Sequence, residues 1–436
     1  MSEIAATLPA PPPGWNELRA TVEWPVRAAL GESILPFWWR TIDREQGGVF
    51  NCWNNDGTQL IRRDKFTWSQ GRFAWLWSKL ADLPAREGLP GTEGDYLAQA
   101  VRTVTFIEAN AFLPDGRCAF LLSEGGEVKE AVPGAGPAPS IYADCFVAMG
   151  LAEFARVTRD HRRLQTAWRL MDSIAARVDS GRFLTHPDPI PPGYRSHAIH
   201  MIQLNVALVV HAAAAALGDP EAKMARERCT ALAAAIFDTF LHPGGRLVEL
   251  WPETEGDHDT VLARHLNPGH ALECLWMLLS VAVRERRTDW ISRATDAVLY
   301  AFQRGWDEEH GGLLHYVDQA GGPPRGRSGD SVYEKSVQGS WSTKLWWVHS
   351  EAVYTSLLLF RLTGNGEARR WCERVFDYAM RVFPQRDPVV GEWIQIRDRT
   401  GVPIERVVAL PVKDPYHITR NFIQVLELFS SCPPTP

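Results

Sequence analysis

Several features that would assign this 436-residue chain to a specialised class are scarce or missing. Its seven cysteines are odd in number and scattered, and no Cys-x-x-Cys pair occurs, which argues against a disulfide framework or a thiolate metal site. The formal net charge is -6, so the basic footprint of a nucleic-acid-binding protein is missing as well. We therefore expect reduced cysteines that serve packing, and no nucleic-acid partner.

Long apolar runs and phosphate-binding motifs are also missing. No apolar run reaches the roughly 18 residues that a membrane-spanning helix needs. The first residues, Met1 to Pro13, lack the charged and apolar regions of a signal peptide. These observations predict a cytoplasmic protein with no membrane partner. A Gly-rich phosphate loop of the Walker type is not found, so we do not assume a nucleotide.

Helical periodicity dominates what is present. Apolar residues recur at helical spacing in about twelve segments. These lie near 15–39, 65–82, 94–111, 141–158, 160–178, 196–217, 220–240, 267–284, 287–304, 345–363, 365–383 and 414–430. Short turns such as Leu217 to Pro220 divide them into pairs typical of helical hairpins. Between the pairs lie longer Gly- and Pro-rich stretches, several with β-hairpin signals such as Gly47-Gly48 and Gly311-Gly312.

Six helical hairpins can close into an all-α toroid, with six inner helices, six outer helices and the connecting loops gathered over one end. Strict sequence repeats are not evident, and no stretch resembles a flexible interdomain linker. We therefore expect a disordered tail at residues 1–14 and a single catalytic domain at 15–432. The alternative is an open solenoid of helix pairs, which would need a shared period that this chain does not show.

Two phrases place a histidine in the same local setting, Asn267-Pro268-Gly269-His270 and Asp414-Pro415-Tyr416-His417. Asn and Asp are preferred N-caps, and Pro suits the first helical position. Each histidine then lies in the first turn of a helix, where the helix dipole favours a neutral imidazole. Two such groups facing one cavity can form an acid/base pair. The alternative is that both are helix-start histidines in unrelated surroundings.

Residues beside these histidines extend the hypothesis. Glu273 follows His270 by three residues, so it can hold the imidazole tautomer, and Trp276 can form a wall for a substrate. Lys413 and Arg420 flank the second phrase, and cations near a helix start indicate an anionic or hydroxyl-rich ligand. Salt bridges to other side chains would explain these charges almost equally well.

Aromatic residues are abundant, with eighteen tryptophans. Most aromatics in any protein fill its core, yet aromatic faces also suit the C–H faces of sugar rings. Three helix starts combine aromatic with long polar side chains, which is typical of a carbohydrate pocket. Their candidate binding residues are Trp68 and Arg72, Tyr142 and Asp144, and Trp346, Trp347 and His349. The planar fork of Arg72 is suited to sugar oxygens.

Together these motifs resemble the N-acylglucosamine 2-epimerase superfamily, which also contains cellobiose 2-epimerases and aldose–ketose isomerases acting on mannose or sulfoquinovose. The motifs are Trp68-x-Gln70-Gly71-Arg72, Asn267-Pro268-Gly269-His270-x-x-Glu273, Trp346-Trp347-x-His349-x-Glu351 and His417-x-x-Arg420. The resemblance implies an (α/α)6 barrel and metal-free chemistry without a cofactor. It also implies that His270 and His417 transfer protons at C2 of an open-chain sugar, with Glu273 in support and Arg72 binding substrate. His200 is a weaker binding candidate, because relatives offer a histidine from a helix in this region.

We expect a 2-epimerase acting on an aldose or N-acylhexosamine, since the first two motifs are similar to those of the epimerase branch. An aldose–ketose isomerase, which returns the proton to C1, stays open. So do a sugar-binding protein without catalysis and a glycoside hydrolase that uses carboxylates such as Asp144, Glu273, Glu351 and Glu392. A hydrolase would leave the paired histidines unexplained. The sequence identifies neither the sugar nor the oligomeric state, and a homodimer is one option.

Overall fold

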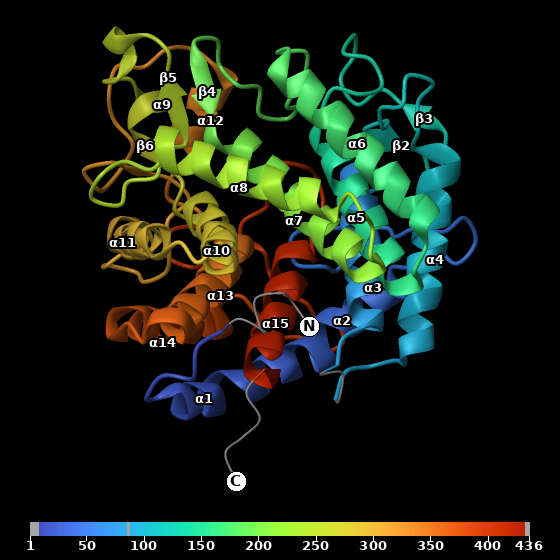
Figure 1. The fold of residues 1–436 in the computed structure, drawn as a ribbon, viewed down its shortest axis with the longest axis horizontal. Helices are drawn as coiled ribbons and strands as arrows, with labels where there is room; N and C mark the ends of the chain where they lie inside the picture. The colour runs from blue at the N-terminus through green and yellow to red at the C-terminus, as the bar shows by residue number, and fades with distance from the viewer. Residues whose placement is uncertain (1–7, 85–87, 432–436) are drawn as a thin grey trace.

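Two concentric layers of helices make up the computed structural model, which describes residues 8–84 and 88–431 (Figure 1). The inner helices are α3 (Thr67–Ala81), α5 (Tyr142–Thr158), α7 (His197–Leu217), α10 (Pro268–Arg284), α13 (Trp346–Thr363) and α15 (Tyr416–Ser430). Each inner helix packs against the next, and α15 packs against α3, so the ring closes. The outer helices are α1 (Trp15–Ala28), α4 (Glu93–Asn110), α6 (His161–Asp179), α8 (Ala222–Thr239), α11 (Thr288–Gly305) and α14 (Gly366–Val382). The structure confirms the predicted all-α toroid, an (α/α)6 barrel.

The ring is completed where the two ends of the chain meet. Helix α1 packs against α15, and Figure 1 shows these two helices side by side at the base of the molecule. Each remaining outer helix packs against the inner helix that precedes it in sequence. Residues 1–7 of the expected tail, and residues 432–436, lie outside the described part of the chain. Leu8, which also belongs to that tail, packs against the core.

Inner and outer helices differ in how far they are buried. Every residue of α13 from Trp346 to Arg361 is buried, whereas α14 buries one face. Helix α7 is long and apolar enough to cross a membrane by length and composition, although the sequence analysis expected no such segment. Of that apolar window, 61% is buried inside the barrel, and the core helix of a barrel meets the same criteria.

Helix boundaries differ from the expected segments mainly at the N-terminus and in the loops. The segment 15–39 divides into α1, a π-helix (Ala29–Ile34) and α2 (Leu35–Arg40). Pro36 lies at this last junction, and its missing N–H interrupts the helical hydrogen bonding. The inter-hairpin stretches contain three additional short helices that periodicity did not predict. These are a 3-10 helix (Glu255–Asp257), α9 (Val261–Arg264) and α12 (Val332–Ser340).

Short strands tie the loops to one end of the barrel. The pairs are β1 (Lys65–Phe66) with β2 (Leu121–Leu122), β2 with β3 (Val128–Lys129), β4 (Tyr194–Ser196) with β5 (Leu250–Pro252), β6 (His265–Leu266) with β7 (Val317–Asp318), and β8 (Lys344–Leu345) with β9 (Ile396–Arg397), all antiparallel. Strands β1, β4 and β8 run directly into α3, α7 and α13, and β6 precedes α10 by one residue. The loops therefore fix the N-terminal ends of these four inner helices.

Two of the loops contain the same seven-residue hairpin, a short motif that was not recognised among the isolated turns of the sequence. Asp43 to Val49 and Asp307 to Leu313 both read Asp, three variable residues, two glycines and an aliphatic residue. The four glycines have φ between 72° and 88°, a left-handed conformation that favours glycine. A fully buried lysine pairs with each Asp: Lys65 with Asp43 at 2.7 Å and Lys344 with Asp307 at 3.2 Å.

A side chain on the following inner helix completes each hairpin. Gln70 accepts a hydrogen bond from the Val49 N–H at 2.9 Å, and His349 Nε2 accepts one from the Leu313 N–H at 2.9 Å. The Nδ1 of His349 lies 2.7 Å from the Leu345 carbonyl oxygen, so this nitrogen donates the second bond. Both ring nitrogens of His349 therefore bond to the backbone. This residue, expected to bind substrate, clamps a hairpin instead.

Candidate active site

The N-terminal ends of the inner helices surround a cavity of about 200 Å³, and all six of these helices contribute to its lining. Eight of the expected site residues lie at its wall. They are Trp68, Arg72, Tyr142, His270, Glu273, Trp346, Trp347 and His417. These residues lie near the N-terminal ends of their helices, and they come together because those ends surround the cavity.

His270 is the third residue of α10 and is fixed from both its backbone and its ring. The side chain of Asn267 caps the helix by accepting the His270 N–H at 3.1 Å, as the first phrase predicts. The ring Nδ1 lies 2.9 Å from Glu249 Oε1. Because a carboxylate can only accept, Nδ1 carries a proton and Nε2 is the atom left for a substrate. His197 lies on the other side of Glu249, with Nδ1 3.7 Å from Oε2.

His417 is the second residue of α15, which begins at Tyr416, one residue later than the phrase predicts. Its Nδ1 lies 2.7 Å from Glu351 Oε1 and 3.7 Å from Glu273 Oε1. Arg420 bonds both of these carboxylates. The tautomer argument that applies to His270 also applies here, so Nε2 of His417 carries the lone pair.

The positions of the carboxylates differ from the expected arrangement. The sequence analysis assigned Glu273 to His270, but Glu249 is the hydrogen-bonded partner of His270, and Glu273 is bonded to Arg420 beside His417. Helical spacing predicts only which residues share one face of a helix. Contacts between different helices and loops decided this pairing.

Arg72 connects the second histidine to the loop that precedes it. Its guanidinium pairs with Asp414, and one of its nitrogens lies 3.4 Å from His417 Nε2. The same guanidinium lies 4.1 Å from the centre of the Phe146 ring and 4.9 Å from that of Tyr416. Arg72 therefore donates a hydrogen bond to Nε2 of His417 and sets a positive charge next to that nitrogen.

Trp347 lies between the two histidines. Its ring centre is 5.3 Å from that of His270 and 5.4 Å from that of His417. An aromatic face at this position can support the apolar side of a sugar carbon chain while an imidazole reaches it from each side.

The two imidazoles have opposite protonation tendencies. Burial opposes the charge of His270, but Glu249, Glu273 and Asp188 raise its pKa to about 8. Burial lowers the pKa of His417 to about 3; Arg72 and Arg420 act in the same direction, against Glu273 and Asp414. At neutral pH His270 is therefore mostly protonated and His417 is neutral. The helix dipole was expected to keep both neutral, which is wrong for His270 because nearby carboxylates outweigh it.

Some residues at the wall were not identified from the sequence. Further residues line the cavity from loops, from α12 or from beyond the first turn of an inner helix: Asp188, Asn205, Glu249, His315, Tyr316 and Tyr333. Glu249 is 3% exposed, and although burial opposes its charge, His270 and His197 hold its pKa well below the ordinary value. Burial raises the pKa of Asp188 to about 6. A lone acidic residue in the apolar run Leu247 to Trp251 is the signal that could have pointed to Glu249.

Six expected site residues are not in the described cavity wall: Asp144, His200, Trp276, His349, Lys413 and Arg420. Asp144 is buried, where it pairs with Arg177 at 2.9 Å and accepts the Cys118 N–H at 2.7 Å. The ring of His200 packs against Phe240 at 5.0 Å. These contacts orient both side chains toward neighbouring elements.

Three of the other four residues bind protein carboxylates, and His349 binds the backbone as described above. Lys413 pairs with Glu392 at 2.8 Å, Arg420 bonds Glu273 at 2.9 Å, and Trp276 donates its ring N–H to Glu351 at 3.0 Å. The cations that were expected to face a ligand therefore neutralise buried acids, which was the open alternative. Arg420 and Trp276 hold the carboxylates that in turn contact His417.

Glu273, Glu351 and His417 offer three ligand atoms within 4.8 Å of one another, a geometry that could suit a metal ion. The guanidinium of Arg420 already bonds both carboxylates, however, and supplies the positive charge that they require. We therefore interpret this group as a salt-bridge network that orients His417.

Fold and cavity define the class as an (α/α)6-barrel protein with two histidines facing one pocket. The sequence model of the N-acylglucosamine 2-epimerase (GlcNAc 2-epimerase) family matches residues 48–420, and the chain belongs to this family. The N-acylglucosamine 2-epimerase of Bos taurus is 30% identical over 404 residues, covering 92% of this chain and 89% of the bovine protein.

Solved structures are similar to the barrel at lower sequence identity. The cellobiose 2-epimerase of Spirochaeta thermophila DSM 6192 has a TM-score of 0.71 at 17% identity, over 96% of this chain and 98% of that one. A D-mannose isomerase also has a TM-score of 0.71 at 17% identity, over 92% of this chain and 97% of that one. These likenesses bear on the fold. Together with the family match they confirm the resemblance inferred from the four motifs.

Proposed function

We propose that the protein is a metal-independent sugar 2-epimerase that inverts C2 of an aldose through an enediolate, or C2 of an N-acylhexosamine through the corresponding enolate. The observation that carries this proposal is the pair of oppositely poised imidazoles, His270 and His417, on one cavity. A base and an acid must approach the same carbon from its two faces if the configuration at that carbon is to be inverted.

The steps follow from the protonation states. Nε2 of neutral His417 removes the proton from C2 of the open-chain sugar, and the electron pair of that bond forms the enediolate with the C1 carbonyl. Nε2–H of His270 then donates a proton to the opposite face of C2. The product is the C2 epimer, and the two histidines have exchanged their protonation states. Solvent exchange restores the starting form.

Surrounding charges match these roles. Glu351 and Glu249 each hold a proton on Nδ1, which leaves Nε2 of both histidines for the substrate. Arg72 lies beside His417 Nε2, where a guanidinium can stabilise the negative charge that develops on the enediolate oxygen. The site thus contains a base, an acid and an electrostatic stabiliser.

An aldose–ketose isomerase is the alternative within the same superfamily. It uses the same proton removal at C2 but returns the proton to C1, so one base on one face is sufficient. The paired imidazoles favour the epimerase, because inversion at C2 requires an acid on the face opposite the base, whereas an isomerase needs a second group only for proton transfer between O2 and O1.

Proton NMR in D2O tests both options. The purified protein is incubated with N-acetylglucosamine, N-acetylmannosamine, glucose, mannose, fructose and cellobiose. Loss of the C2 proton signal with formation of the C2 epimer supports the epimerase and identifies its sugar, whereas a ketose product assigns the protein to the isomerases. Exchange in none of the sugars, with or without prior EDTA treatment, contradicts the proposal for this panel. We expect EDTA to leave the rate unchanged.

A further inference from the structure

A third copy of the repeated hairpin precedes the His417 phrase and departs from the other two at its last two positions, where Glu392 replaces the second glycine and Trp393 replaces the aliphatic residue. Asp387 to Trp393 has the Asp and the first glycine, and the Gly391 N–H donates to the Asp387 carbonyl at 3.0 Å. Glu392 stands where the other copies have their second glycine and keeps the positive φ, 65°. A left-handed backbone is strained for a residue with a side chain, so this carboxylate is retained against a local cost.

The Glu392 carboxylate lies in a buried polar network. It is 0% exposed and pairs with Lys413, which is 1% exposed, at 2.8 Å. The same ammonium donates to the carbonyl oxygens of Asn55 and Trp393 at 2.7 Å each. The lysine therefore holds together three segments that are far apart in the sequence.

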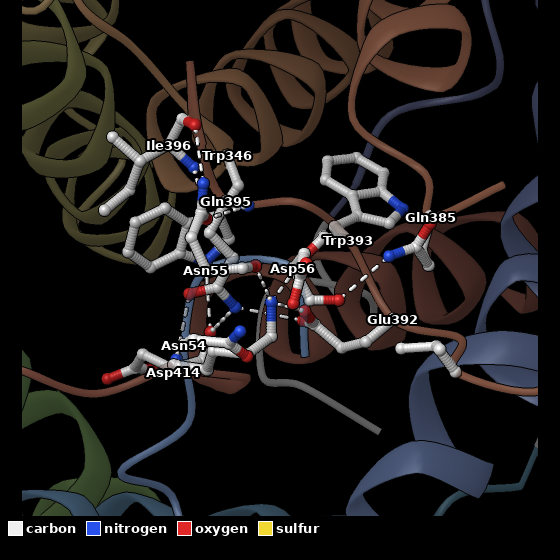
Figure 2. Close-up of polar contacts among 12 residues, drawn as sticks. Asn54, Asn55, Asp56, Trp346, Gln385, Glu392, Trp393, Gln395, Ile396 and Asp414 are labelled. Carbon is white, nitrogen blue, oxygen red and sulfur yellow. Dashed lines mark hydrogen bonds and ion pairs between the residues drawn. The ribbon is translucent and has the colours of Figure 1, made fainter. Parts of the chain in front are cut away.

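Gln395 connects this ion pair to the site, as Figure 2 shows. Its Nε2 donates to Glu392 Oε1 and to the Asp414 carbonyl oxygen at 3.0 Å each, and its Oε1 accepts the Asp414 N–H at 3.0 Å. A single amide thus binds both backbone polar groups of Asp414. Trp346, whose ring lines the cavity, donates to the same carbonyl oxygen at 3.0 Å.

Asp414 is the residue through which this network reaches the reacting groups. One of its carboxylate oxygens pairs with Arg72, and the other accepts the Tyr416 N–H at 2.7 Å at the start of the helix that carries His417. A shift of the Asp414 backbone would move the guanidinium beside His417 and the first turn that presents the imidazole.

We propose that Gln395, backed by the buried Glu392–Lys413 pair, is a positioning residue that holds Asp414 and thereby sets Arg72 and His417 for proton transfer. This inference rests on the proposed function for its kinetic test. It identifies residues that touch no substrate and yet control the rate.

The chain offers a matched control for this test. Gln70, which is fully buried, makes the same double contact with a backbone: its Oε1 accepts the Val49 N–H and its Nε2 donates to the Val49 carbonyl, at 2.9 Å each. In the described part of the chain, Val49 makes no hydrogen bond with Arg72 or His417. Gln395→Leu and Gln70→Leu therefore each remove a pair of side-chain bonds to one backbone residue, and only the first removes them from Asp414, together with the bond to Glu392.

The experiment measures kcat, KM and thermal stability for both variants with the sugar that the wild type epimerises. We expect Gln395→Leu to lower kcat by at least tenfold more than Gln70→Leu does, with a smaller change in KM. Equal effects of the two variants on kcat, or a normal kcat in Gln395→Leu, would overturn the proposal.

A second variant covers the possibility that Gln395→Leu does not fold. The double substitution Glu392→Gly with Lys413→Met gives this hairpin the glycine of the other copies and leaves no unpaired charge. We expect it to fold and to lose at least threefold in kcat. An unchanged kcat would overturn the role of the ion pair.

Failure of the proposed function is distinguishable from failure of this inference. If the wild type exchanges no proton in any sugar, the proposed function fails. The surroundings of His417 can then still be compared between the variants by the 15N resonances of its side chain. A shift of these resonances in Gln395→Leu but not in Gln70→Leu supports positioning. Unchanged resonances in both variants overturn it.

Discussion

At the scale of single residues, the charge next to each imidazole decides which histidine is the acid. His270 has to be protonated to donate, so the rate of epimer formation, measured in the direction in which His417 removes the proton, should fall as the pH rises through about 8, the pKa that Glu249 helps to set. This fall is the alkaline limb of the pH–rate profile. Glu249→Gln removes the negative charge beside His270 and should move this alkaline limb to lower pH. We expect at least a tenfold loss of rate at pH 8, with a smaller loss at pH 6. Initial rates of epimer formation between pH 6 and 9 measure the shift of this limb.

Glu227→Gln is the control, because Glu227 is exposed and pairs with Lys223 on the outer helix α8. It should leave the limb where it is in the wild type. A limb that stays in place in Glu249→Gln would mean that His270 is not the acid.

Substitution of each histidine separately should distinguish the base from the acid. His417→Ala should abolish exchange at C2 for the epimer whose proton faces His417, because no other group described here is placed to remove it. His270→Ala should still exchange that proton for deuterium but form no epimer, since the reprotonating acid is missing. NMR of each epimer separately tests this asymmetry. Equal loss of exchange for both epimers in both variants would contradict the assignment.

At the scale of elements, the close approach of α10 to α13 explains the glycine in the first phrase. A Cβ on Gly269 would lie 2.6 Å from two ring atoms of Trp347 and 2.7 Å from a methyl group of Val348. Gly269→Ala should therefore displace the tryptophan that contacts both histidines. We expect a loss of about 1–3 kcal/mol in the free energy of unfolding and at least a tenfold loss in kcat. Urea unfolding and initial rates measure the two effects.

Gly256→Ala is the matched control, because a Cβ there meets no atom within 4 Å. It should change neither quantity measurably. Normal activity in Gly269→Ala would show that the position of Trp347 is not critical.

Local sequence signals predicted the elements well and their partners poorly. Periodicity located all twelve main helices, and cap chemistry placed His270 in the first turn of α10, because both depend on residues close in the chain. The partner of His270 is Glu249, in a loop, and the partner of Glu273 is Arg420, on another helix. Such pairings depend on how six helix ends meet. The expected ligand roles of Lys413 and His349 failed for the same reason.

The repeated hairpin could have been found from the sequence. Its Asp, its paired glycines and a lysine further along the chain recur in the sequence. The copies are short and widely separated, however, and each copy was interpreted as an isolated turn. Only the contacts of Lys65 with Asp43 and of Lys344 with Asp307 show that the copies are equivalent. The motif then explains why a glutamate at the third copy is informative.

At the scale of the whole molecule, buried neutral histidines should make the protein sensitive to acid. Burial lowers the pKa of His315, His349 and His417 to about 3. The unfolded chain takes up a proton at each of these below about pH 6.5, whereas the folded chain does so only near pH 3. Their contribution is therefore fully present above about pH 6.5 and is lost as the pH falls toward 3.

Within that window, each of these histidines lowers the free energy of unfolding by about 1.4 kcal/mol for each unit by which the pH falls. The three together lower it by about 4 kcal/mol per pH unit. His270 acts in the opposite direction: its stabilising contribution is present below about pH 6.5 and is lost as the pH rises through about 8. Since a typical domain has only about 5–15 kcal/mol in total, the urea midpoint should fall steeply between pH 6.5 and 5.

The repeated hairpin supplies the variant that tests this directly. Gln70 occupies in the first copy the position that His349 occupies in the second, and both accept the N–H of the hairpin residue that follows the paired glycines. His349→Gln should therefore keep that bond while removing one titrating group. We expect the slope of unfolding free energy against pH, measured between pH 6 and 5, to fall by about 1.4 kcal/mol per pH unit. Substitution of the exposed His161 by Gln should leave the slope unchanged. A slope in His349→Gln equal to that of the wild type would mean that His349 is already charged in the folded protein.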